Sequence, residues 1–212
     1  MPIKNKQMKN NIERRNISSS EFEVREAEDG SFIIEGYGSV FNSESKNLGG
    51  FYEYISPDAF RNADMTQTVA LINHDNNYPL ARSPKNLQLT IDERGLKYTI
   101  SLGNQSYARD LYESIKRGDI TSSSFAFTIA DGGDTWEKRD GKLIRTIDEI
   151  DVLYDVSAVT NPAYASATVS ARSLEKVESF TTEKNEEKNE DKKTPQSYYR
   201  KLKYILLKKK TK

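Results

Sequence analysis

Residues 20–172 consist mainly of short strand-like segments that are separated by turn signals. Apolar and polar residues alternate within these segments, which is typical of strands with one face in a core. The period changes in residues 105–116, where apolar residues recur at i, i+3, i+4 and i+7, so an amphipathic helix is predicted there, with Gly118 as its cap. A chain with many strands and one clear helix can bury a core as a packed sheet or a partly closed barrel.

Two pairs of segments are predicted to form hairpins. Residues 87–102 alternate on both sides of a turn that Gly95 is expected to close. Residues 135–147 contain Asp140-Gly141, a dipeptide that tolerates the positive φ of a type I′ turn. Because hairpins join antiparallel strands, the expected fold class is α+β, a mostly antiparallel β-barrel or packed sheet with peripheral helices. The other strands are expected at residues 32–41, 51–55, 69–74, 123–130 and 150–159.

Composition divides the chain into three parts. Charged residues make up 30% of the 212 residues and mean hydropathy is −0.77, which is too polar for a chain that folds throughout. We therefore expect a basic, flexible arm at residues 1–19 and a folded domain at residues 20–172. Residues 173–212 are expected to be a charged, disordered tail with a basic amphipathic end.

Several classes of function are disfavoured by composition. The formal net charge is zero, so no overall field favours nucleic acid. The chain has no cysteine and one histidine, so disulfides, zinc sites and cysteine nucleophiles are not expected, nor is any metal or cofactor. It also lacks a P-loop and any apolar run long enough for a secretory signal or a membrane span. We expect a soluble, intracellular protein.

His74 is the only histidine, in the segment VALINHDNNYPLA (69–81). An imidazole titrates near neutral pH and can take and return the proton of a serine hydroxyl. A lone histidine is more often a surface or satisfied core residue, so the functional interpretation requires a hydroxyl and an acid elsewhere in the chain.

Ser124 is the candidate hydroxyl. Strict alternation along residues 122–127 places Ser123 with Phe125 and Phe127 in the core, and leaves Ser124 accessible on the opposite face. The alternative is a serine-rich edge strand with no chemistry.

Asp155 is the leading candidate for the acid. Its apolar neighbours Leu153 and Val156 indicate a core strand, and a charged group in a core needs a partner. Asp75 follows the histidine directly but would point to the opposite face if the strand continued through it.

The segments that carry these residues, taken together, resemble the prohead (capsid maturation) serine proteases of tailed bacteriophages. The resemblance covers about residues 20–172. It rests on IIEGYGSVFNSES followed by FYEYISPDAF, then ALINHD, a helix that ends in RGDI, SSSFAFTI, and LYDVSAVTNPAYASAT. The order histidine, serine and a DVS strand that leads to Asn-Pro-Ala is the specific part of the pattern.

The resemblance implies a protease domain similar in fold to herpesvirus assemblin, with His74 as general base, Ser124 as nucleophile and Asp155 as the acidic member. It implies a serine endopeptidase that cleaves the major capsid protein or a scaffold protein, and itself, inside the assembling prohead in the cytoplasm of the bacterial host. Self-association is a further expectation. The alternative is a non-catalytic assembly or scaffolding protein of the same fold. Donors for an oxyanion are sought in residues 161–164, or in Arg172.

Overall fold

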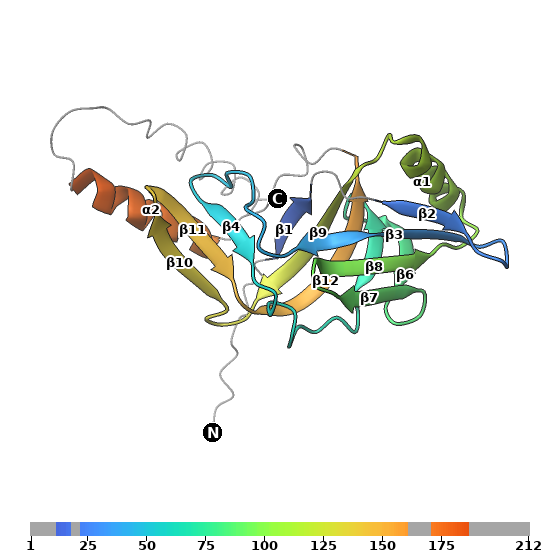
Figure 1. The fold of residues 1–212 in the computed structure, drawn as a ribbon, viewed down its shortest axis with the longest axis horizontal. Helices are drawn as coiled ribbons and strands as arrows, with labels where there is room; N and C mark the ends of the chain where they lie inside the picture. Colours follow the sequence, from blue (N-terminus) through green and yellow to red (C-terminus); the bar gives the residue numbers. More distant parts are fainter. Residues whose placement is uncertain (1–11, 18–21, 161–170, 187–212) are drawn as a thin grey trace, which may run out of the picture. The chain divides into compact units, whose positions relative to one another are not determined.

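The computed structural model describes residues 12–17, 22–160 and 171–186, and its strands form three sheets (Figure 1). The largest sheet has five strands. In sheet order they are β1 (Glu13–Ile17), β9 (Ser122–Ile129), β12 (Ile150–Val159), β5 (Val69–Ile72) and β6 (Asp75–Arg82).

The other two sheets have four and three strands. The four-stranded sheet contains, in order, β2 (Glu23–Glu26), β3 (Phe32–Val40), β8 (Gly95–Ser101) and β7 (Leu87–Ile91). The three-stranded sheet contains β10 (Asp134–Arg139), β11 (Lys142–Ile147) and β4 (Tyr52–Ile55). Two pairings, β12 with β5 and β11 with β4, are parallel and the others are antiparallel, as the hairpin signals indicated. The described strands close no barrel, so of the two predicted architectures the structure shows packed sheets.

One apolar core joins the five-stranded and four-stranded sheets. Phe125 and Phe127 of β9 are buried with stacked rings whose centroids are 4.7 Å apart, and they share a cluster with Ile34 of β3 and Tyr98 of β8. The predicted helix is α1 (Ser106–Arg117), whose apolar face is buried and whose Tyr112 ring lies 4.5 Å from that of Phe32.

Two of the three predicted glycine roles are observed as expected. Asp140 and Gly141 have φ of 51° and 74° between β10 and β11, and Gly118 ends α1 at φ 84° with its N–H bonded to Ile115 O. Gly95 differs, because it is the first residue of β8 and not a left-handed turn residue. A Cβ there would lie 1.9 Å from Ser39 O, so close approach of β3 is what requires glycine.

Residues 1–19 were predicted to be a flexible arm, but residues 13–17 of this segment form β1, which pairs with β9 along its whole length. The prediction failed because it used composition alone. Glu13 and Arg15 are polar in sequence, yet both are buried against charges from other sheets.

Residues 173–212 were predicted to be disordered, but α2 (Ala171–Glu186) extends through the first part of this segment. Charge alone was a poor guide, because Glu, Lys, Leu and Arg are good helix formers and α2 has no Gly or Pro. The chain divides into two units, residues 1–177 and 178–212, and the boundary falls within α2. The amphipathic end at 197–212 lies outside the described residues. Neither described helix is long and apolar enough to cross a membrane.

Candidate active site

His74 lies in the turn between β5 and β6, not in a strand. The predicted strand at 69–74 ends at Ile72, and both Asn73 and His74 have positive φ, 53° and 58°. The turn is fixed to β12, because Asn73 N–H donates to Ala158 O at 3.0 Å and Thr160 N–H donates to Asn73 Oδ1 at 3.0 Å. Asp75 was expected to point to the opposite face from His74 only if one strand continued through both residues. Because His74 lies in a turn, that expectation does not apply.

The structure brings the three predicted site residues together. His74 Nε2 lies 2.6 Å from Ser124 Oγ, and Nδ1 lies 2.6 Å from Asp155 Oδ1. Strands β9 and β12 are neighbours in which Asp155 is opposite Ala126, two residues along from Ser124. Hydroxyl and carboxylate thus share one face of the sheet, and the imidazole from the turn bridges them. Asp155 is buried, as predicted, and His74 is its partner.

Ser157 is a fourth member of the site, which the sequence analysis missed. Its hydroxyl donates to Asp155 Oδ1 at 2.8 Å and accepts from His74 N–H at 3.2 Å. Ser157 is opposite Ser124 across the β9–β12 pair. The signal was present in the sequence, since residues i and i+2 of a strand share a face and Ser157 is two residues after Asp155.

Ser123 faces the core, as predicted. Its hydroxyl lies 2.9 Å from the hydroxyl of Tyr98 and 3.4 Å from Ser157 O. Burial raises the pKa of Tyr98, so that phenol stays protonated and serves as a hydrogen-bond group. Of the two adjacent serines, Ser124 is the one in contact with the imidazole.

Ser124 was expected to be accessible, but its exposed fraction is 0%. β1 contributes to this burial, because it makes β9 an interior strand and places Asn16 opposite Ser124. Ser124 Oγ lies 2.9 Å from Arg15 O as well as close to the imidazole. A hydroxyl has one proton and cannot donate to both. The main chain of β1 therefore lies directly beside the Ser124 hydroxyl.

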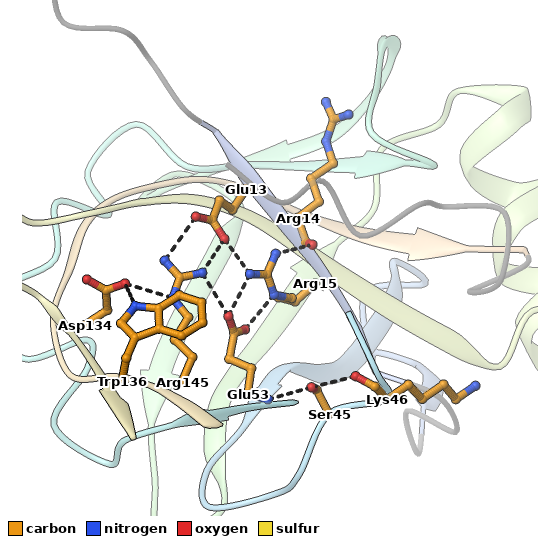
Figure 2. Close-up of polar contacts among 9 residues, drawn as sticks. All are labelled: Glu13, Arg14, Arg15, Ser45, Lys46, Glu53, Asp134, Trp136 and Arg145. Carbon is orange, nitrogen blue, oxygen red and sulfur yellow. Dashed lines mark hydrogen bonds and ion pairs between the residues drawn. The ribbon is translucent and has the colours of Figure 1, made fainter. Parts of the chain in front are cut away.

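An ion cluster of four residues, Glu13, Arg15, Glu53 and Arg145, holds β1 in this place (Figure 2). Arg15 forms a fork with Glu53 at 2.5 and 2.7 Å and also contacts Glu13. Arg145 donates to Glu13 at 2.8 and 3.2 Å and to Glu53 at 3.1 Å. All four residues are at most 5% exposed. Burial acts to raise the pKa of Glu13, but Arg15 and Arg145 outweigh burial and hold that pKa below its ordinary value.

The described residues do not test the predicted oxyanion donors. Residues 161–164, the first candidates for oxyanion donors, lie outside the described residues, as does the side chain of Arg172. Within the residues described, no group of three or more His, Asp or Glu side chains is placed to hold a metal ion.

A solved structure and a protein family are similar to this chain. A solved structure, the capsid assembly protease gp21 of bacteriophage T4, is similar with a TM-score of 0.44 and 12% identity, over 70% of this chain and 99% of that chain. No curated protein matches this chain. The model of the caudovirus prohead serine protease family matches residues 20–182, which is well over half of the sequence. The chain belongs to the caudovirus prohead serine protease family.

Proposed function

We propose that this protein is a serine endopeptidase of prohead maturation in which Ser124 is the nucleophile, His74 the general base and Asp155 the residue that orients the imidazole. The observation that carries this proposal is the pair of 2.6 Å contacts on the two ring nitrogens of the only histidine. Family membership supports the reaction class, and these contacts support the choice of residues.

The geometry supports the following sequence of steps. Ser124 Oγ attacks the peptide carbonyl carbon while its proton moves to His74 Nε2, and Asp155 accepts the Nδ1–H hydrogen bond and remains ionised. Collapse of the tetrahedral intermediate breaks the C–N bond, and Nε2 gives the proton to the leaving amine. Water then attacks the acyl-enzyme, His74 takes its proton, and that proton returns to Oγ as the acid product leaves. Residues 161–164 and Arg172 remain candidates to donate to the oxyanion.

The expected substrates are the major capsid protein, a scaffold protein, or this chain itself, acted on inside the assembling prohead. The expected likeness in fold to herpesvirus assemblin and the self-association remain predictions. β1 places a main-chain carbonyl beside Ser124 Oγ, so self-cleavage would first be sought there.

Co-expression with the major capsid protein tests the proposal. Wild-type protein should shorten the capsid protein, and Ser124→Ala should abolish the shortening. Ser122→Ala is the matched control, because Ser122 is buried in the same strand and no contact joins it to His74 among those described above. Shortening that persists in Ser124→Ala would assign the nucleophile elsewhere.

The non-catalytic alternative has one observation in its favour, the complete burial of Ser124 in a strand that is flanked by β1. The same experiment separates the two functions. Shells that assemble normally with wild-type protein but contain only full-length capsid protein would favour the assembly role.

A further inference from the structure

β1 occupies the position that a peptide would take if it bound to β9 as an added strand. It runs antiparallel to β9, with Glu13 opposite Phe127 and Arg15 opposite Phe125, and it brings the carbonyl of Arg15 to 2.9 Å from Ser124 Oγ. Peptides that bind to a sheet edge use the same main-chain hydrogen bonds, and pockets for alternate side chains provide specificity. The side chains of β1 therefore show which groups such a peptide would place beside β9.

Glu13 and Arg15 are two residues apart, so both point to the same side of β1, and both are buried. Their partners come from the three-stranded sheet. Glu53 lies on β4 and binds Arg15, while Arg145 lies on β11 and binds Glu13. The guanidinium of Arg15 also lies 5.6 Å from the centroid of the Phe127 ring. In a strand bound in the place of β1, the residue at the Arg15 position would thus face Glu53, and the residue at the Glu13 position would face Arg145 (Figure 2).

When β1 leaves, these partners lose different amounts of interaction. Arg145 keeps a contact with Asp134 at 3.0 Å. Glu53 loses both arms of its fork with Arg15 and keeps Arg145 at 3.1 Å. A carboxylate that is buried with too few partners is unfavourable, and an incoming guanidinium restores the planar two-bond arrangement. The vacated position therefore favours a cation next to Glu53 and an anion next to Arg145.

We infer that Glu53 and Arg145 form a specificity subsite that selects substrates with a basic residue directly before the cleaved bond and an acidic residue two positions earlier. The inference rests on the proposed function. The basic position follows from the carbonyl beside Ser124, which belongs to Arg15, and the acidic position follows from Glu13. Arginine is favoured over lysine, because only a guanidinium forms the fork.

A peptide series measures the preference on the full-length wild-type protein. Peptides of one sequence that carry Arg, Lys, Gln or Glu before the cleaved bond are compared by kcat/KM with mass spectrometry. We expect Arg to exceed Gln by roughly 10- to 100-fold, Lys to fall between them, and Glu to be the poorest. A second series with Glu, Gln or Lys two positions earlier should favour Glu.

Equal rates across the series, or a preference for Glu before the bond, would overturn the subsite while leaving the protease function intact. Failure to cleave any peptide or the co-expressed capsid protein would overturn both.

Glu53→Gln tests the residue itself. It should reduce the Arg-to-Gln ratio of kcat/KM to near unity, and this ratio does not depend on how much of the variant is folded. Glu44→Gln is the control, because Glu44 also pairs with a cation, Lys142, but is exposed and is not part of the ion cluster. A Glu53→Gln protein that keeps the wild-type ratio would show that the subsite is elsewhere.

Discussion

The hydroxyl of Ser157 joins the acid and the base of the candidate site. It donates to Asp155 Oδ1 and accepts from the main-chain N–H of His74, so it holds both the carboxylate and the turn that carries the imidazole. Because His74 has a positive φ, its backbone needs such support. Ser157 is a positioning residue, since it contacts neither the attacking oxygen nor the expected substrate.

Ser157→Ala is expected to lower kcat by roughly 10- to 100-fold, because a hydrogen bond to a charged group contributes about 1.5–3 kcal/mol. KM should change little, because Ser157 holds the acid and the histidine turn and is not expected to touch the substrate. Steady-state kinetics measures kcat and KM separately. Ser157→Thr, which keeps a hydroxyl, should recover most of the activity. An unchanged kcat in Ser157→Ala, or no recovery in Ser157→Thr, would reduce Ser157 to a packing role.

Gly95→Ala is expected to destabilise the fold by more than about 3 kcal/mol, because the new Cβ would overlap Ser39 O and force β3 and β8 apart. Gly118→Ala is the comparison, since its Cβ would meet open space and only the left-handed backbone would oppose it, at about 1–2 kcal/mol. Denaturant unfolding of both variants gives the two values. Equal losses would mean that the β3–β8 contact relaxes easily.

β1 is a strand whose docking depends on charge. Its buried side chains, Glu13 and Arg15, are both ionic, and their partners lie on the three-stranded sheet. A buried ion cluster stabilises a fold only while every charge has its partner. Removing one partner typically costs about 3–5 kcal/mol of folding stability. The attachment of β1 should therefore respond to pH more sharply than the attachment of an apolar strand.

The direction of that response follows from Glu13, whose pKa is lower when β1 is docked than when it is free. Its contribution is complete above the ordinary carboxyl pKa and is lost as pH falls through the lowered value. Hydrogen-exchange protection of the β1 amides should thus be constant from neutral pH down to about 4 and fall in stronger acid. Glu13→Gln should weaken protection at neutral pH and remove the acid step. Glu23→Gln on the exposed strand β2 should change neither, and a step that survives in Glu13→Gln would exclude Glu13 as its cause.

Across the molecule, the sequence was most informative where one local rule determined the structure. Helical periodicity predicted α1 and Asp140-Gly141 predicted its hairpin, because both signals depend on a few adjacent residues. His74, Ser124 and Asp155 were selected as candidates by residue type, order and family resemblance, and the structure places them in contact. The strand beside Ser124, β1, was missed, because Glu13 and Arg15 are buried only through partners about 40 and 130 residues away in sequence. Ser157 was missed because its role depends on the position of His74 in a turn.

Cleavage is expected to require a rearrangement within the five-stranded sheet. Ser124 is buried and contacts β1, so we expect β1 to part from β9 before a substrate reaches Ser124. The chain has no cysteine, so one engineered pair can test this. Arg14 and Ala126 are opposite each other across β1 and β9. Opposite residues of antiparallel strands have Cα atoms about 4.5–5.5 Å apart, which is within the range of a disulfide. Oxidised Arg14→Cys/Ala126→Cys protein should show no detectable cleavage of the capsid protein, and reduction should restore it. Thr135→Cys/Thr146→Cys, across β10 and β11, should be active in both states. Full activity of the oxidised β1–β9 pair would mean that substrate reaches Ser124 with β1 in place.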